Sequence, residues 1–159
     1  MSIVYNRVDG RMVHGQVASS WAKTLNADEI LVLNDEVSKD NQQVSLMKLA
    51  VMGACEVDAF TIKTGVEIIQ DEDFNGDRTF IIFKTIDDAK AAVEAGYTPS
   101  TLYIGGMYQE KDKQEVAIAL CVDDHDLEVF RFLEDHGVNL IYQVSPLNKE
   151  KALSSLIQY

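Results

Sequence analysis

The sequence predicts an α/β protein with an open, twisted, three-layer architecture: a sheet of about seven strands, mostly parallel with one antiparallel strand, and helices on both faces. Two observations predict this class. Short runs rich in Ile, Val, Phe and Tyr alternate with helix-length segments, and several runs are almost wholly apolar, as in a sheet buried on both faces. The length of 159 residues suits a single domain, 1–159, with a substantial hydrophobic core.

Seven segments are predicted to be strands, because each is short and rich in β-branched or aromatic residues. They are Ile3–Val8, Glu29–Leu33, Glu56–Ile62, Arg78–Phe83, Thr101–Ile104, Glu115–Leu120 and Asn139–Val144. About ten residues without a helical pattern join the fifth of these strands to the sixth. A connection that short favours an antiparallel pair over a crossover.

Six segments are predicted to be helices, which cross between parallel strands with a right-handed turn. They are Gln16–Leu25, Asn41–Met52, Thr64–Gln70, Ile86–Ala95, Asp124–His136 and Lys149–Gln158. The fifth helix begins with acidic residues, which the helix dipole favours at that end, and Gly137 is expected to cap its other end. Pro146 is expected to start a turn before the last helix.

The composition excludes several classes of partner and location. The chain has 26 acidic and 14 basic residues, a formal net charge of −12, which repels nucleic acid and anionic lipid. Cys55 and Cys121 lie far apart without a CxxC spacing, so we expect free thiols in a reducing cytoplasm. No apolar stretch approaches the ~20 residues of a membrane span, and the N-terminus does not resemble a signal peptide, so the sequence predicts a cytosolic protein.

The stretch from Arg7 to Gln16 is the strongest candidate for a functional site. It holds two of the four arginines in an acidic chain, and it leads from the first predicted strand into the first predicted helix. His14 lies on that strand-to-helix turn. Ligands of open parallel sheets gather beyond the carboxyl ends of the strands, where this loop is expected to lie.

An anion beside His14 would meet a set of donors. The backbone N–H groups of Gly15, Gln16 and Val17 have no partners inside the helix that begins there, so they point toward such a ligand. The arginines, Arg7 and Arg11, are expected to add planar contacts to phosphate oxygens. Asp9 either orients the imidazole ring or tethers an arginine, and the tether is the favoured interpretation.

A neutral imidazole is a competent nucleophile near pH 7, and phosphoryl transfer depends mainly on positioning and cationic donors. The loop therefore suits a phosphohistidine at His14. A helix-capping or surface histidine is the plain alternative, and chemistry alone leaves the two interpretations open. Two other functions stay open as well: a non-catalytic anion- or nucleotide-binding regulatory module, and a hydrolase that uses the histidine as a general base.

Three further sites are weaker candidates. Gly105 and Gly106 follow a strand and form either a structural turn or a second wall of the site, and Asp35 either caps a helix or borders the cleft. His125 and His136 are eleven residues apart on one predicted helix, which is not the spacing of a metal pair. No P-loop or dinucleotide motif is present, so the sequence predicts no metal and no cofactor.

The segment RVDGRMVHGQV (Arg7 to Val17) resembles the signature of IIB components of the mannose/fructose/sorbose class of bacterial sugar phosphotransferase systems. Asn34–Val37 is similar to the DEV segment of that family, Ile104–Met107 to its GGM loop, and Cys121–Asp123 to its SVD-type helix entry. The matches run in order down the whole chain. The family fold that this resemblance implies is an open, mostly parallel α/β sheet with one antiparallel strand.

The resemblance implies a protein-N(pi)-phosphohistidine–sugar phosphotransferase in which His14 carries the phosphoryl group. The group would come from a phosphohistidine of a IIA protein or domain and go to a sugar carried by the IIC/IID membrane components, with Arg7 and Arg11 stabilising it in transit. The protein would then be cytoplasmic and associated with the inner face of the plasma membrane. Homo-oligomerisation stays open, and so does the sugar, with mannose, fructose, sorbose and N-acetylgalactosamine among the candidates.

The chain departs from the family pattern at three places. Gly10 stands where many relatives carry an acidic or otherwise polar residue, Val51–Ala54 lacks common prolines, and Cys121 replaces a common serine. None of these changes touches the histidine or the arginines, so the implied mechanism is unaffected.

Overall fold

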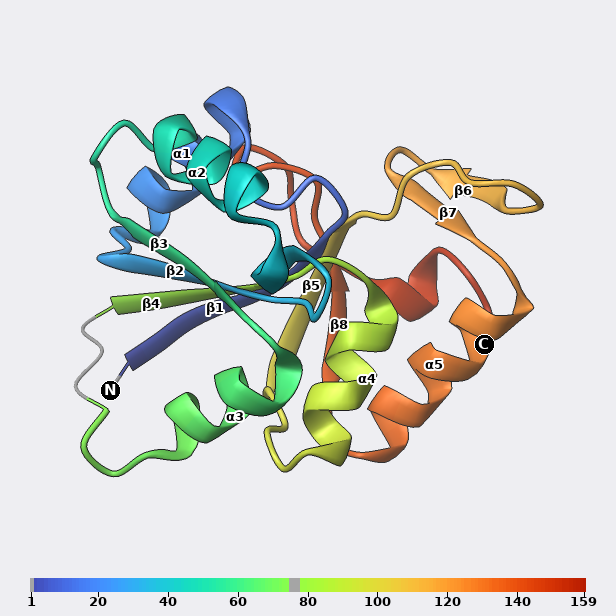
Figure 1. Ribbon diagram of the computed structural model, residues 1–159. Coiled ribbons are helices and arrows are strands. Elements are labelled where there is room, and N and C mark those ends of the chain that lie inside the picture. Colours follow the sequence, from blue (N-terminus) through green and yellow to red (C-terminus); the bar gives the residue numbers. More distant parts are fainter. Residues whose placement is uncertain (1, 75–77) are drawn as a thin grey trace.

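The central sheet has the strand order β3-β2-β4-β1-β5-β8-β9 in a computed structural model, which describes residues 2–74 and 78–159 (Figure 1). Its strands are β1 (Ser2–Asp9), β2 (Glu29–Leu33), β3 (Glu56–Phe60), β4 (Arg78–Phe83), β5 (Thr101–Gly106), β8 (Asn139–Tyr142) and β9 (Lys151–Ala152). The pairings are parallel except for β8 with β9, which is antiparallel. The predicted class, a seven-stranded and mostly parallel α/β sheet with one antiparallel strand, is confirmed.

Helices cover both faces of the sheet (Figure 1). One face carries α1 (Gly15–Leu25), the short 3-10 helix η1 (Val37–Lys39) and α2 (Asn41–Ala50). The other carries α3 (Ile62–Gln70), α4 (Ile86–Glu94) and α5 (Asp124–Asp135). This division follows from the crossovers. The connections from β1 to β2 and from β2 to β3 run across the first face, and the later connections, from β3 to β4, β4 to β5 and β5 to β8, run across the second.

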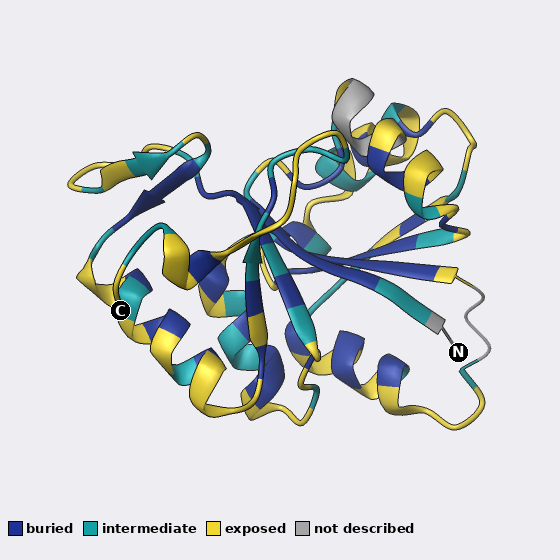
Figure 2. Ribbon diagram, turned by 180° about the vertical axis from the view of Figure 1, so that it is seen from behind, coloured by how far each residue is buried: buried dark blue, intermediate teal, exposed yellow. Residues whose placement is uncertain are grey.

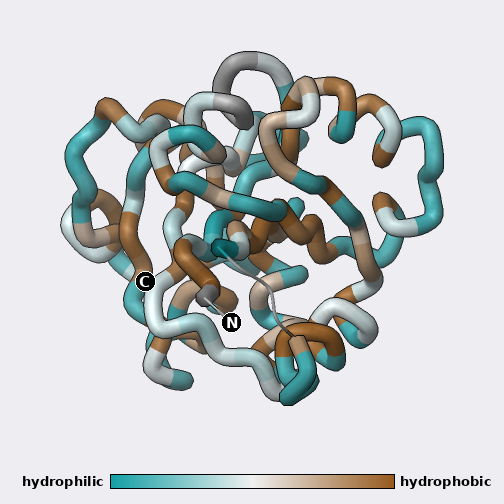
Figure 3. The backbone as a smooth tube through the Cα atoms, turned by 90° about the vertical axis from the view of Figure 1, so that its left-hand side faces the viewer, coloured by the Kyte–Doolittle hydropathy of each residue, from teal (hydrophilic) through white to brown (hydrophobic). Residues whose placement is uncertain are grey.

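Alternation along the strands builds a hydrophobic cluster on each face. On β2, Leu31 and Leu33 point into the cluster under α3, α4 and α5, whereas Ile30 and Val32 point into the cluster under α1 and α2. Side chains of neighbouring strand residues point to opposite faces, so a strand buried on both faces is apolar throughout. Figure 2 shows the buried strands between the inward faces of the helices, and Figure 3 shows hydrophobic and hydrophilic stretches alternating along the backbone.

The predicted strand Glu115–Leu120 is interrupted by a turn, and its expected antiparallel pairing with the strand before it is wrong. The chain forms instead a hairpin of β6 (Gln114–Ala117) and β7 (Leu120–Val122), which pair with each other in a separate two-stranded sheet. Ala119, with φ of 55°, turns the chain between them. An alanine in a left-handed conformation leaves no signal in the sequence, since that position usually favours glycine or asparagine.

The predicted C-terminal helix Lys149–Gln158 is also wrong. Lys151 and Ala152 pair with β8 as strand β9, and a short 3-10 helix, η2 (Leu153–Ser155), follows. The edge of β8 offers unpaired backbone groups, and pairing there satisfies them. Leu153, which is fully buried, fixes the register of this segment against the core.

The other helices agree with the prediction to within a few residues, and their ends have local causes. An Asp123–Asp126 capping box starts α5, and Gly137, with φ of 86°, follows its last turn as expected. The helix α2 ends two residues before its predicted end, because Met52 and Gly53 adopt positive φ values. None of the helices in the described residues is long and apolar enough to cross a membrane.

Candidate functional site

The candidate loop leaves the carboxyl end of β1, the strand that lies between β4 and β5. It leads into α1 on one face of the sheet, whereas the segments that follow β4 and β5 lead to α4 and α5 on the other face. Connections that part to opposite faces open a crevice at the carboxyl edge of such sheets. The fold therefore places this loop where an α/β protein binds its ligands.

His14 is the N-cap residue of α1, with extended backbone angles, and its side chain makes no capping hydrogen bond. The imidazole is only partly exposed, and its Nδ1 lies 3.3 Å from the carbonyl oxygen of Met12. This geometry removes the plain alternative of a helix-capping side chain. Gln16 and Val17 are in the first turn of α1, and their side chains lie outside the described residues, so the expected anion contact concerns only their backbone N–H groups and that of Gly15.

Asp9 ties the loop to the sheet. Its Oδ2 lies 3.4 Å from Nε of Arg7, and its Oδ1 accepts a hydrogen bond of 3.0 Å from the backbone N–H of Arg11. The backbone carbonyl of Asp9 accepts a further bond from Met12. The favoured interpretation of Asp9 as a tether for an arginine agrees with this ion pair.

Arg7 is buried against backbone groups of neighbouring segments. Its side chain is 1% exposed, and the guanidinium donates to three backbone carbonyls, those of Gly105, Gln143 and Val144, at 2.7 to 3.2 Å. It also stacks on the ring of Trp21, 4.7 Å from the centroid. These bonds use the guanidinium to join β1, β5 and the segment after β8, and the contact of Arg7 with phosphate oxygens stays a prediction.

Arg11 is exposed, in contrast to Arg7. Its guanidinium carbon lies 4.6 Å from the centroid of the Tyr108 ring, a cation–π distance. In the described part of the chain, no carboxylate forms an ion pair with it. Of the two arginines, Arg11 is thus the one whose charge remains available to an anion at the loop.

The two glycines at the end of β5 permit a close approach. A Cβ on Gly105 would clash with the carbonyl oxygen of Gln143 and lie 2.5 Å from a guanidinium nitrogen of Arg7, and a Cβ on Gly106 would clash with the carboxylate of Asp9. Neither glycine has a positive φ. Both glycines lie in a strand and pack against the Arg7–Asp9 pair, so they do not form a turn, and a second wall of the site stays a prediction.

Asp35 has a local structural contact. Its Oδ1 accepts a hydrogen bond of 2.9 Å from the backbone N–H of Ile62, the first residue of α3. The neighbouring Asn34 donates to Asp88 at 2.8 Å and accepts from the backbone of Val37 at 2.9 Å. These two residues hold the segment after β2 against α3 and α4. Asp35 thus accepts a hydrogen bond from the start of a helix, as the helix-capping interpretation expects, and that helix is α3.

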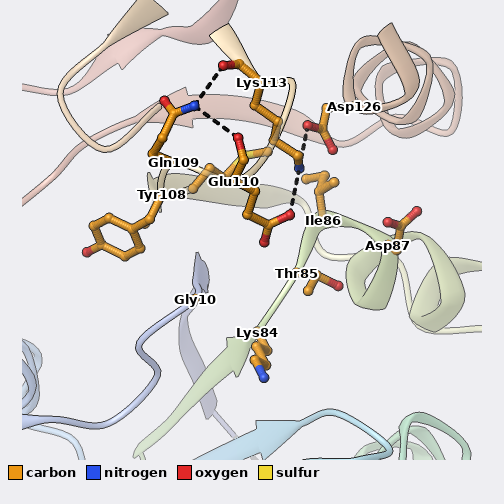
Figure 4. A pocket seen from close by; sticks show the side chains of 12 residues that line it. Gly10, Lys84, Thr85, Ile86, Asp87, Tyr108, Gln109, Glu110, Lys113 and Asp126 are labelled. Carbon is orange, nitrogen blue, oxygen red and sulfur yellow. Dashed lines mark hydrogen bonds and ion pairs between the residues drawn. The ribbon is translucent and has the colours of Figure 1, made fainter. Parts of the chain in front are cut away.

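A cavity of about 270 Å³ lies beside the loop (Figure 4). It is bordered by Gly10, by the first residues of α4 and by the segment after β5, and its walls include Tyr108, Lys113 and Asp126. Lys113 Nζ lies 2.9 Å from the buried Asp126 carboxylate. Burial raises the pKa of Asp126, and the ammonium group opposes that shift.

The remaining histidines and both cysteines lie outside the loop. His125 pairs with Asp87 at 2.7 Å, and His136 Nδ1 lies 2.8 Å from the carbonyl of Phe132. Cys55 and Cys121 are free thiols, as expected. Among the described residues, no group of three or more His, Cys, Asp or Glu side chains is arranged to hold a metal ion.

Comparisons with known proteins agree with this arrangement. The model of the family described as "PTS system sorbose subfamily IIB component" matches residues 3–159. The sorbose-specific EIIB component of Klebsiella pneumoniae is 31% identical over 91% of this chain and 88% of its own. The mannose-specific EIIAB component of Escherichia coli K12 is 29% identical over 88% of this chain and 43% of its own. The crystal structure of the IIB domain of the Klebsiella sorbose permease superimposes with a TM-score of 0.90 at 28% identity, covering 98% and 95% of the two chains.

The fold and its relatives define a class, the phosphocarriers that act in sugar uptake. Within that class, the chain belongs to the sorbose subfamily of IIB components of the phosphotransferase system. It is a IIB sugar phosphotransferase component, as the sequence motifs indicate.

Sequence reasoning missed several parts of the site. The sequence does not single out Tyr108, nor the carbonyls of Gln143 and Val144 that accept hydrogen bonds from Arg7. Backbone carbonyls carry no residue-specific signal, so only the fold reveals them. Tyr108 has one signal in the sequence, its place two positions after a glycine pair at a strand end.

Proposed function

We propose that His14 is the residue that carries the phosphoryl group. The observation that carries this proposal is the position of the histidine, at the N-cap of α1 beyond the central strand, with a side chain that makes no capping bond. The first N–H groups of α1 and the guanidinium of Arg11 provide positive charge on the same loop. Arg7 and Asp9 have a different role in this proposal: their buried ion pair fixes the conformation of the loop.

The chemistry requires little besides positioning. A lone pair of the imidazole attacks the phosphorus of a phosphohistidine on the donor protein, a new N–P bond forms, and the donor histidine keeps the electron pair of the bond that breaks. Charge in the transition state is spread over the peripheral phosphoryl oxygens. Arg11 and the helix N-terminus stabilise that charge, and the same groups serve the second transfer, from His14 to a sugar hydroxyl.

We place the phosphoryl group on Nδ1. Nε2 is buried and, within the described residues, lacks a hydrogen-bond partner, so an incoming donor has no access to it in this ring orientation. Attack by Nδ1 uses the tautomer that carries its proton on Nε2, and this tautomer gives up only the contact of Nδ1 with the Met12 carbonyl, which at 3.3 Å is a weak hydrogen bond. Phosphorus–nitrogen correlations in an NMR spectrum of the labelled protein distinguish the two isomers, and a phosphoryl group on Nε2 would contradict this assignment.

The partners proposed are a IIA protein or domain as donor and the IIC/IID membrane components as the place of transfer. The mannose-specific relative supports the first, because its name joins an A and a B component in one chain. A cytoplasmic protein that docks at the inner face of the plasma membrane follows from such partners. The acceptor is a sugar, to be tested among sorbose, mannose, fructose and N-acetylgalactosamine.

Intact-mass measurement tests the assignment of His14. The chain is incubated with a phosphorylated IIA protein, and the mass of one phosphoryl group is sought on the wild type and on His14→Ala, with His125→Ala and His136→Ala as matched controls. We expect the adduct on the wild type and both controls, and no adduct on His14→Ala. An adduct on His14→Ala would show that another residue carries the group. Saturable anion binding without any adduct on the wild type would favour a regulatory module.

A further inference from the structure

The ring of Tyr108 supports the exposed arginine of the loop. The Arg11 guanidinium lies 4.6 Å from the ring centroid. The ring edge also lies against Gly10, where an added Cβ would stand 3.6 Å from Cδ2 of the tyrosine. The backbone of the arginine is fixed independently by its hydrogen bond to Asp9, so the tyrosine acts on the far end of a side chain whose near end is already anchored.

The segment that carries Tyr108 is anchored at both ends. On one side, the carbonyl of Gly106 accepts a hydrogen bond of 2.7 Å from Gly10, and Met107 exchanges backbone bonds with Ala119 and Cys121. On the other side, Lys113 pairs with the buried carboxylate of Asp126 at 2.9 Å (Figure 4).

Bonds within the segment stiffen it. Gln109 donates to the carbonyls of Glu110 and Lys113, each at 2.9 Å (Figure 4). The ring is thus held by the sheet and by α5, while the arginine that rests on it is exposed.

We propose that Tyr108 is a positioning residue for phosphoryl transfer: its ring holds the Arg11 guanidinium over the loop, ready for the phosphoryl group on His14. The inference rests on the proposed function of the histidine. A free arginine side chain samples many rotamers, and confining it in advance reduces the entropy lost when it binds the transferring group. A cation–π contact at an exposed site is weaker than a charge-assisted hydrogen bond to phosphate. The ring therefore orders the arginine side chain and still lets it leave the ring to bind the phosphoryl group.

The test compares Tyr108→Leu, which removes the ring, with Tyr108→Phe, which keeps the ring and removes only the hydroxyl. Single-turnover transfer from phosphorylated IIA protein is measured over a range of donor concentrations. We expect Tyr108→Leu to lower the rate at saturating donor about two- to fivefold, the range of an exposed cation–π contact, with an unchanged half-saturating concentration. The phenylalanine variant should restore most of the rate. Tyr159→Leu, on the C-terminal segment, is the control and should leave the rate unchanged.

A double-mutant cycle separates positioning from loss of structure. If the ring acts through Arg11, then Tyr108→Leu should slow the Arg11→Ala variant no further. Equal slowing in both backgrounds would overturn the proposal, and so would a wild-type rate for Tyr108→Leu or an equal loss for the phenylalanine variant. If the wild type forms no phosphate adduct, both the proposed function and this inference are overturned. If Tyr108→Leu forms a normal adduct at an unchanged rate, only this inference is overturned.

A spectroscopic readout is independent of activity. Protons of the Arg11 side chain above an aromatic ring are shifted upfield by the ring current, and we expect this shift in the wild type and in Tyr108→Phe but not in Tyr108→Leu. It should shrink when the chain is phosphorylated, because the guanidinium then turns toward the phosphoryl group. Identical arginine spectra in wild type and Tyr108→Leu would contradict the proposed contact.

Discussion

At the scale of single residues, the two arginines of the loop have different surroundings and therefore different roles. Arg7 is buried and bound to three carbonyls and a carboxylate, whereas Arg11 is exposed and rests on an aromatic ring. The sequence presents them as equivalent, four positions apart and on either side of Asp9. Only the fold shows that Arg7 has a structural role and that the charge of Arg11 is available to an anion.

Substitution of the arginines should separate stability from activity. Arg7→Met leaves the buried Asp9 carboxylate without its cation, so we expect the free energy of unfolding in urea to fall by about 3–5 kcal/mol. Arg11→Ala removes an exposed side chain and should change that free energy by less than about 0.5 kcal/mol. Its phosphoryl transfer should instead slow on the order of 100-fold, as when one donor to a developing charge is removed.

Arg7→Lys is the matched variant, since it keeps the charge but cannot reach all three carbonyls from a single ammonium group. Its stability should fall between that of the wild type and that of Arg7→Met. If Arg7→Met were as stable as the wild type and only its transfer rate fell, the structural role of this arginine would be wrong.

The sequence predicted the histidine and the carboxylate tether because both depend on local chemistry: a nucleophile at a strand-to-helix turn, and an acid two residues from an arginine. It did not predict the burial of Arg7, because the carbonyls that accept its hydrogen bonds come from residues about 100 or more positions away. Such long-range partners are set by the order of strands in the sheet.

At the scale of elements, a histidine–carboxylate pair links α4 to α5. His125 Nε2 lies 2.7 Å from Oδ1 of Asp87. The hydrogen bond to this carboxylate, followed by its charge, raises the pKa of His125, to which Asp123 and Asp126 also contribute. Since the folded-state pKa is raised, the pair stabilises the fold fully below the unfolded-state pKa of ~6.5, and that contribution is lost as the pH rises through the folded-state value.

The pair therefore predicts a pH dependence of stability. The urea midpoint of the wild type should decrease, relative to that of Asp87→Asn, as the pH rises from about 6 to above the raised pKa of the histidine. Both side chains are more than half exposed, so the effect should be small and should weaken in high salt. Parallel pH profiles for the two proteins would show that this contact does not stabilise the fold.

Strands whose apolar sequence matches their burial on both faces of the sheet were predicted well. The strands β2 and β4 agree with the prediction residue for residue, because they are apolar runs buried on both faces. The hairpin β6–β7 and the strand β9 were missed for a different reason. Their structure depends on a left-handed alanine and on the free edge of β8, and neither is visible in a local window of sequence.

At the scale of the whole molecule, two hydrophobic clusters share one sheet. Trp21, the single tryptophan, belongs to the cluster under α1 and α2, whereas α3, α4 and α5 cover the other. The apolar residues of β2 divide between the two clusters, Leu31 and Leu33 in one and Ile30 and Val32 in the other, so the loss of either cluster would also destabilise the sheet. We expect the chain to unfold as a single domain.

Coincident unfolding curves test this expectation. Tryptophan fluorescence reports on one face of the sheet and far-ultraviolet circular dichroism on all the helices, so the two urea transitions should have the same midpoint and slope. A fluorescence midpoint below the main circular dichroism midpoint, with a partial loss of dichroism at the same urea concentration, would show that the layer of α1 and α2 unfolds separately.

The transfer of a phosphoryl group from a IIA protein through His14 to a sugar can be followed in one labelling experiment. Radioactive phosphate is followed from a phosphorylated IIA protein, through this chain, to sugar in membrane vesicles that contain IIC and IID. We expect label on the wild-type chain first and on the sugar afterwards, and neither step with His14→Ala. Labelled sugar formed at the wild-type rate with His14→Ala as the only IIB component would show that His14 does not carry the group.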